Sequence, residues 1–326
     1  MKVASGLTWA ALLVLGSAGQ PLWAKESQVL EVTDRGALAN ASQLAVVSFN
    51  VGFIFESIDQ TAKTGGLMGA FGGTTKARSS LVGVTPEMMQ QITDAAYADF
   101  VQRVAAKGFT IAQASFDGLS GERGPSEENI KLEKKSTGKA VFYAPSAMPM
   151  QVFLRGDVAQ RKSLANFGDE GRAGRNSFAV EQAAKTSGVP AIGVVYLIDF
   201  SDQKRPGAFS FGGTLKVNAN LSIVPDYSKV TIIGANGKKN EIVLNDPVSI
   251  DGDFVEVADA TSKTEKTAQA AGNIAGGIGA ALGIGAPRIG KTRKFEFTAK
   301  AETYQQGAIE LAGATNAIVV DAILPR

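Results

Sequence analysis

The chain contains no cysteine and no histidine. The absence of cysteine excludes disulfides, thiolate metal sites, cysteine nucleophiles and a lipid-modified cysteine. The absence of histidine removes the commonest general base, and it excludes Ser-His-Asp triads, Cys-His pairs and His-liganded zinc sites. Because these side chains carry so much of enzyme chemistry, the composition favours a protein that is not an enzyme, with no metal and no cofactor.

An excess of charge of one sign is also missing. Lys and Arg number 33 against 31 for Asp and Glu, so the chain as a whole has no strong field to attract nucleic acid. Hydrophobic residues make up 44% of the sequence, which is enough to build a core rather than a disordered chain. We therefore expect protein partners, and neither nucleic acid nor a nucleotide.

The first 24 residues have the layout of a secretory signal peptide. Met1 and Lys2 are a short basic start, and Leu7–Leu15 is an apolar run. Small residues then lead to a predicted cleavage site after Ala24, with Ala18 as a second candidate. The apolar run is too short to span a bilayer as a helix. A cysteine-free exported chain fits a bacterial periplasm or outer membrane, so we expect the mature protein to be periplasmic or associated with the outer membrane.

Residues 25–200 are predicted to form an α/β region. The run Leu44–Phe55 is typical of a buried strand, Thr85–Lys107 of a capped helix that ends before Gly108, and Phe109–Ala114 of a second strand. If the two strands are parallel neighbours, the crossover between them is right-handed. Three further segments complete the region: a charged loop or linker over 117–139, helix over 157–185 broken near 168–174, and an apolar strand over 190–200.

Residues 201–326 are predicted to be rich in strands. Thr214–Val224 alternates between apolar and polar residues, and Asn236-Gly237 is a strong signal for a two-residue hairpin. Alternation around Phe295 and the apolar run Ala317–Leu324 indicate two more strands. The predicted fold class is α/β or α+β, with a mixed sheet and packed helices in the first half and antiparallel strands in the second. The two regions are either separate or one continuous domain.

A Gly-rich insertion at 268–286 carries the candidate contact residues. Gly272 and Gly276 form one G-x-x-x-G pair, and Gly279 and Gly283 form another, a spacing that lets helices approach closely in oligomers and membranes. The alternative is an ordered or flexible Gly-rich loop, because each glycine costs helix stability. The shorter segment 64–73 has a similar composition.

Two other motifs raise chemical hypotheses. Gly285–Thr292 matches the phosphate-binding pattern G-x-x-x-x-G-K-[ST], which needs a helix after the loop, but the sequence that follows alternates like a strand. Five carboxylates lie close together in the sequence but lack the spacing of a calcium loop. We therefore interpret them as solvated charges in turns and at strand edges rather than as a metal site. These are Asp246, Asp251, Asp253, Glu256 and Asp259. We identify no catalytic residue.

The first part of the chain resembles the opening of periplasmic α/β domains of the TolB N-terminal and curli-secretion-channel type. The shared order is a signal peptide, a strand at Leu44–Phe49, a helix at Thr85–Lys107 and a strand at Phe109–Ala114. A later strand at Lys216–Val224 fits the same plan. The curli channel has apolar insertions that build a pore, so the resemblance implies such a role for the Gly-rich segments. That channel is a lipoprotein, whereas this chain has no cysteine to carry lipid.

These observations favour a non-enzymatic cell-envelope protein that works by binding or assembly, with itself or another envelope protein as partner. The first alternative is a pore-type oligomer that inserts 268–286 into a membrane. The second is a carboxylate-dependent hydrolase of cell-wall or glycan material, which would need two carboxyl groups about 5–10 Å apart.

Overall fold

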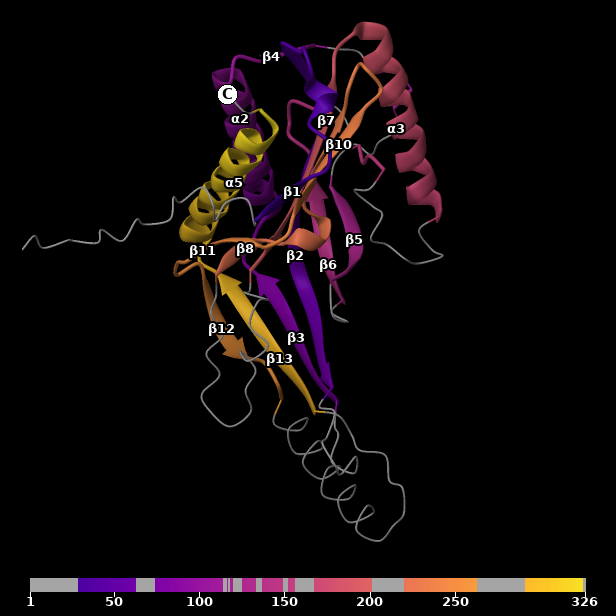
Figure 1. The fold of residues 1–326 in the computed structure, drawn as a ribbon. Coiled ribbons are helices and arrows are strands. Elements are labelled where there is room, and N and C mark those ends of the chain that lie inside the picture. The colour runs from indigo at the N-terminus through magenta and orange to yellow at the C-terminus, as the bar shows by residue number, and fades with distance from the viewer. Residues whose placement is uncertain are drawn as a thin grey trace, which may run out of the picture.

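Strand β2 (Gln43–Ala62), 20 residues long, connects the two parts of the molecule. Its first half pairs in parallel with β7 (Ala191–Asp199), and its last seven residues pair antiparallel with β3 (Thr74–Val82). On its other side β6 (Thr137–Tyr143) pairs with Val51–Ile58, with a register shift between Ile54 and Glu56. The shift therefore falls where β7 ends and β3 takes its place along β2 (Figure 1).

The computed structural model describes residues 29–62, 74–113, 116, 118–119, 125–132, 137–148, 152–155, 167–200, 220–262 and 291–324. The predicted signal peptide lies outside these residues. The remaining strands are β1 (Leu30–Val32), β4 (Thr110–Ile111), β5 (Ser126–Lys131), β8 (Leu221–Ile223), β9 (Lys229–Ile233), β10 (Lys239–Leu244), β11 (Val248–Ile250), β12 (Val255–Asp259) and β13 (Lys291–Ala299). The helices are α2 (Pro86–Ala106), α3 (Phe167–Ser187) and α5 (Ala301–Ile323), with short 3-10 turns at Gly36–Leu38 and Pro225–Tyr227.

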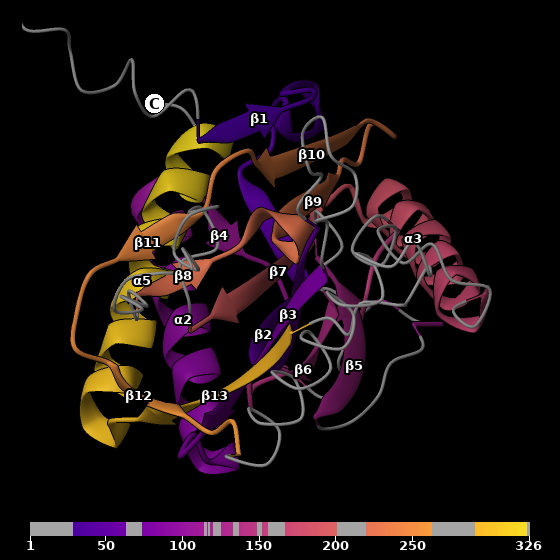
Figure 2. The same cartoon turned by 90° about the horizontal axis from the view of Figure 1, so that it is seen from below.

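The main sheet has the strand order β1-β10-β9-β7-β2-β3-β13-β12, with parallel and antiparallel pairs. This confirms the predicted mixed fold class. Helices α2 and α5 lie side by side on one face, and α3 lies on the other (Figure 2). We call the helices and the strands between them the body. All nine residues of β7 are buried, as expected for a central strand covered on both faces.

Helix α2 forms where its local signals predict it. The Thr85 side chain accepts a hydrogen bond from the Met88 backbone N–H at 3.2 Å, and Pro86 occupies the first turn. The apolar residues that recur every four positions are buried against the sheet, and Gly108 follows the helix with a φ of 86°. Strand β4 then pairs with the start of β2 in parallel, so the predicted strands at both ends of this segment are neighbours. Strand β3 lies between β2 and α2, so the order is strand, strand, helix, strand rather than strand, loop, helix, strand.

The hairpin of β9 and β10 is confirmed, but its turn is wider than predicted. The Gly237 N–H donates to the Gly234 carbonyl at 3.0 Å, and the Gly234 N–H donates to the Lys238 carbonyl at 2.8 Å. Gly237 has a φ of 78°, whereas Asn236 does not have a positive φ. The loop is therefore a β-turn followed by a glycine bulge, rather than a two-residue turn that needs both residues in the left-handed region.

Three sequence predictions were wrong. Within 117–139, part of the predicted loop is strand, because β5 and β6 form an antiparallel hairpin. Helix α3 continues through Gly171 and Gly174 instead of breaking there. The end of the chain, Ala317–Leu324, is helix up to Ile323, because apolar residues recur at helical spacing from Tyr304 onward and bury one side of α5. Of the predicted strand Thr214–Val224, only Leu221–Ile223 lies in a described strand.

Candidate functional site: the four-stranded arm

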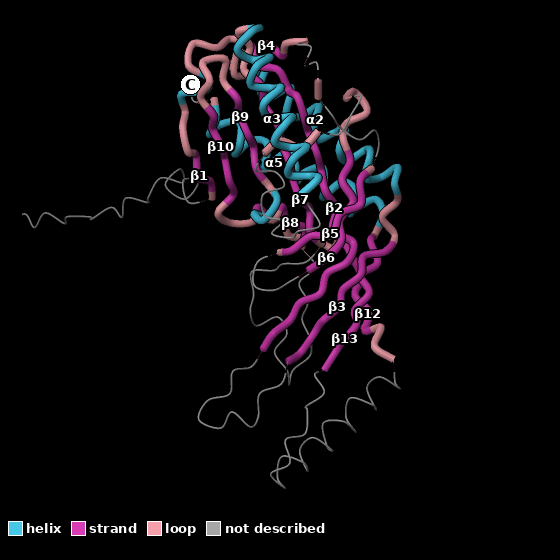
Figure 3. The backbone as a smooth tube through the Cα atoms, turned by 90° about the vertical axis from the view of Figure 1, so that its right-hand side faces the viewer, coloured by secondary structure: helices cyan, strands magenta, loops and turns pink. Residues whose placement is uncertain are grey.

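Four strands extend from the body without helices over them, and we call this sheet the arm (Figure 3). It consists of Glu56–Ala62 of β2 with all of β3, β13 and β12, in that spatial order. Strands β3 and β13 are parallel, with Thr75 opposite Lys291 and Val82 opposite Thr298. The arm is thus built from two hairpins that are far apart in the sequence and lie side by side.

Strand directions place both hairpin connections at one end of the arm. Strands β2 and β12 run toward that end, and β3 and β13 run away from it. The sequence between β2 and β3 contains 64–73, and the sequence between β12 and β13 contains 268–286. The predicted contact residues Gly272, Gly276, Gly279 and Gly283 lie outside the described residues. We call the end of the arm where β3 and β13 begin the distal end.

One side of the arm near the body is apolar. Phe295, Phe297 and Leu81 are buried, and the register places Leu81 opposite Phe297. The Phe297 ring packs on the Phe200 ring, with their centroids 4.8 Å apart. Phe200 follows β7 directly, so this contact joins the arm to the end of the central body strand.

The Phe254 side chain holds the start of β12 against helix α5. Its ring fills the space where a Cβ atom of Gly307 would lie, and it also covers Gly252. Glycine at 307 therefore allows the ring to touch the helix backbone. Beside it, the Lys300 ammonium lies 2.6 Å from the Asp253 carboxylate and 3.8 Å from that of Glu256. The Asp253 hydrogen bond raises the pKa of Lys300.

Strand β12 forms an open edge of the arm. Among the described strands it pairs with β13 alone, and residues 256–259 are exposed. The Phe254 carbonyl accepts from Lys300 N–H, and the Ala260 N–H donates to the Lys294 carbonyl. Because backbone groups alternate in direction along a strand, Val255, Val257 and Asp259 direct their N–H and C=O groups outward. On the opposite side of the arm, β6 pairs with β2 as far as Ile58, which lies opposite Thr137. Among the described strands, residues 59–62 then pair with β3 alone.

Basic residues gather in the distal half of the arm. Thr74–Arg78 and Lys291–Lys294 together hold five Lys or Arg residues and no Asp or Glu. Arg78 and Lys294 are exposed and directly opposite each other across β3 and β13, hence on one face of the sheet. One step closer to the body, Glu296 and Glu56 both lie opposite Ser80 on that same face. On this face the sign of the charge therefore changes along the arm, whereas on the opposite face the register places Asp59 level with Arg293.

The phosphate-binding motif lacks the structural setting that it needs. Lys291 is the first residue of strand β13, so a strand rather than a helix follows the motif. A helix N-terminus is what would bind the phosphates in such a loop.

The five carboxylates of 246–259 are dispersed rather than gathered around a site. Asp251 accepts a hydrogen bond from the Asn220 amide at 2.6 Å, Asp253 pairs with Lys300, and Asp259 accepts from the Thr261 N–H at 2.9 Å. In the described part of the chain, no group of three acidic side chains could hold a metal ion.

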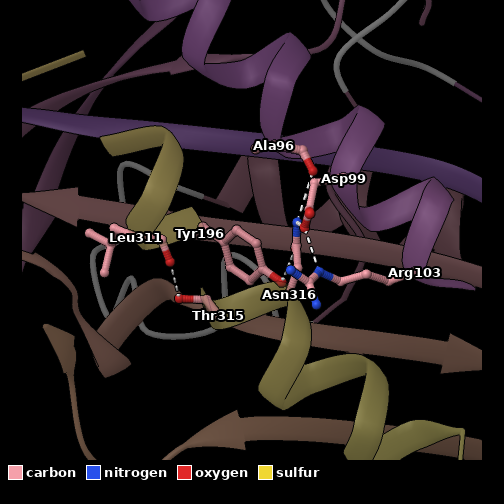
Figure 4. Close-up of polar contacts among 7 residues, drawn as sticks. All are labelled: Ala96, Asp99, Arg103, Tyr196, Leu311, Thr315 and Asn316. Atoms are coloured by element: carbon pink, nitrogen blue, oxygen red, sulfur yellow. Dashed lines mark hydrogen bonds and ion pairs between the residues drawn. The ribbon is translucent and has the colours of Figure 1, made fainter. Parts of the chain in front are cut away.

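A buried polar cluster joins α2, α5 and β7, and the sequence analysis did not find it (Figure 4). The Asn316 amide donates 2.9 Å hydrogen bonds to the Ala96 carbonyl and the Asp99 carboxylate, and its oxygen accepts one from the Tyr196 hydroxyl at 2.9 Å. Asp99 also pairs with Arg103 at 2.7 Å. Burial, together with the charge of Asp99, raises the pKa of Tyr196. A polar residue on the apolar side of α5 was the available signal, but it needs that segment to be recognised as a helix.

Comparison with known proteins finds no matching family model, no matching curated protein and no matching solved structure. The resemblance to TolB N-terminal and curli-channel domains therefore stays a prediction. Among the described helices, none is both long enough and apolar enough to cross a membrane.

Proposed function

We propose that this protein is an exported, non-enzymatic assembly protein of the cell envelope, and that the arm is its contact with a second copy or with another envelope protein. The observation that carries this proposal is the arm with two open edges. An unpaired strand edge is a template for further strand pairing, and proteins usually cover or shorten it. Here β12 and the end of β2 are both left open among the described strands.

The direction of the two edges fits a repeating contact between copies. Strands β2 and β12 run the same way, so β12 of one copy can pair with β2 of the next as a parallel ladder when both copies have the same orientation. Such a contact joins two different surfaces of the chain, which generates a ring or a filament rather than a simple dimer. The apolar Val257 side chain, 39% exposed, adds to this edge.

A membrane-inserting oligomer is the second candidate. The direction of the arm strands favours it, because both Gly-rich segments connect strands at the distal end. The segment 267–287 holds no charged residue and is preceded by Lys266 and followed by Arg288. The proposed export rests on residues 1–24, and periplasmic or outer-membrane location follows from it.

The experiment is a substitution on the β12 edge. Val257→Pro removes an outward backbone N–H without removing a hydrogen bond to β13, so it should block strand addition and weaken self-association at least about tenfold. Val257→Thr keeps the N–H and serves as the matched control, with unchanged association expected. Light scattering after size exclusion, in buffer and in detergent, measures the mass of each form.

A wild-type chain that remains monomeric in both media, with no envelope protein co-purifying, would refute the assembly proposal. Equal masses for wild type and Val257→Pro would show that a different surface makes the contact. Thermal unfolding of the variant checks that the fold is retained.

A further inference from the structure

We infer that the open edge of β12 takes up an extended segment of another envelope protein, in which a lysine or arginine stands next to an apolar residue. This inference rests on the proposed function, because it names the partner of the same edge. Residues 246–262 hold five carboxylates and no Lys or Arg, although the whole chain has a net charge of +2. The sequence around β12 is therefore acidic, which favours a cationic partner.

An apolar row that ends at this edge is the first argument. The register places Leu81, Phe297 and Val257 level with one another on β3, β13 and β12. Leu81 and Phe297 are buried, whereas Val257 is 39% exposed, because the described sheet has no further strand beside it. An added strand with an apolar side chain opposite Val257 would extend the row by one position and cover this side chain.

The balance of charge at the start of β12 is the second argument. The Lys300 ammonium lies 2.6 Å from the Asp253 carboxylate and 3.8 Å from that of Glu256, so one cation is shared by two anions. The Glu256 side chain is 75% exposed. Arg293 and Lys294 of β13 lie distal to all the residues that β12 pairs with. On an added strand, the neighbour of the residue opposite Val257 lies opposite Glu256, where a cation stabilises the pairing and a carboxylate destabilises it.

The other open edges of this chain do not supply such a segment, which is the third argument. Among the described strands that pair on one side only, β1, β4, β11, β12 and residues 59–62 of β2 contain no Lys or Arg. Strand β5 does hold Ile130 next to Lys131. However, Ile130 is buried in its own body, and the Lys131 N–H donates to the Tyr227 hydroxyl at 3.1 Å. Strand direction thus permits a second copy at the β12 edge, whereas the side chains favour a different protein.

The test measures the binding of short fluorescent peptides to the mature chain by anisotropy. One peptide alternates lysine with valine, the second alternates glutamate with valine, and the third alternates lysine with threonine. The first should bind about tenfold more tightly than either of the others, because it alone offers both the cation and the apolar side chain.

Two variants locate the binding at the β12 edge. Val257→Pro removes an outward N–H and should abolish binding of the lysine–valine peptide. Glu256→Lys should weaken the lysine–valine peptide and strengthen the glutamate–valine peptide, each about two- to fivefold. The matched control Glu31→Lys makes the same change in charge at an exposed position of β1, at the other end of the strand order, and should alter neither affinity.

Equal binding of the lysine–valine and glutamate–valine peptides would overturn the inference, as would binding that both edge variants leave unchanged. Light scattering of the chain without peptide separates this inference from the assembly proposal. Oligomers that Val257→Pro dissociates, together with no peptide binding, would keep assembly through a second copy and refute the partner named here. A monomeric chain that binds the peptides in the expected order supports a different protein as the partner, and a monomeric chain that binds none refutes it.

Discussion

At the residue scale, substitution of Asn316 is expected to lower the free energy of unfolding. Its amide satisfies the Ala96 carbonyl and the Tyr196 hydroxyl in a fully buried place between α2, α5 and β7. Asn316→Ala leaves the Tyr196 hydroxyl without its acceptor and removes a hydrogen bond to the Asp99 carboxylate, whereas the Ala96 carbonyl keeps its bond within helix α2. A buried unpaired group costs about 1–3 kcal/mol. We expect a loss of about 2–4 kcal/mol in the free energy of unfolding, measured with urea. Asn129→Ala on the exposed edge strand β5 is the control, with a change near zero; equal losses would contradict this account.

Glu181 predicts a dependence of stability on pH. Hydrogen bonds from Lys239 on β10 and Lys185 on α3 lower the pKa of Glu181 to about 2, below its usual value of 4.5. The carboxylate therefore stabilises the folded state above pH 4.5, and this contribution is lost as the pH falls toward 2. Because both lysines are partly exposed, Glu181→Gln should cost only about 0.5–1 kcal/mol at neutral pH. Urea unfolding should show that the difference from wild type shrinks as the pH approaches 2. A constant difference would rule out this ion pair as its source.

At the scale of elements, two glycines of helix α5 should respond in opposite ways to the same substitution. A Cβ at Gly307 would collide with the Phe254 ring, which is closed in on its other side by Gly252. A Cβ at Gly313 would only make ordinary contacts with Asp99, with the nearest atom 3.8 Å away. Alanine gains up to about 1 kcal/mol over glycine in a helix. We therefore expect Gly313→Ala to stabilise the protein and Gly307→Ala to destabilise it, as thermal unfolding would measure.

The elements also show what the sequence could predict. Helix α2 was predicted because its cap, its apolar stripe and its terminal glycine are all local signals. Ala317–Leu324 was misjudged because a short apolar run fits a strand as well as the last turns of a helix. The hairpin of β5 and β6 was missed because β5 and the start of β6 carry polar and charged residues, such as Glu127 and Lys139, which are also typical of a loop. The arm could not be predicted from the sequence, because β3 and β13 are far apart in the chain and no local pattern indicates that they pair.

At the scale of the whole molecule, the body and the arm should respond differently to loss of 268–286. Strands β12 and β13 still have five register pairs without that segment, so the thermal unfolding of the body should be nearly unchanged. If the Gly-rich segment makes the envelope contact, the deleted chain should be smaller in detergent and absent from the outer-membrane fraction. Soluble monomers for both the full and the deleted chain would show that the segment makes no contact, and attention would move to the edge of β12.

The pairing of β3 with β13 also sets the order of events when the protein is made. Ribosomes deliver the chain from its beginning, so β3 is complete long before Lys291–Ala299 and helix α5 are synthesised. Until then neither the arm nor the helix layer of α2 and α5 can close. Contacts between segments this far apart in the sequence form slowly, and until they form the chain exposes apolar surface and unpaired strand edges. If the chain is exported unfolded and the arm makes the proposed contact, that surface would form only after the last segment has crossed the membrane, and self-association would be delayed until then.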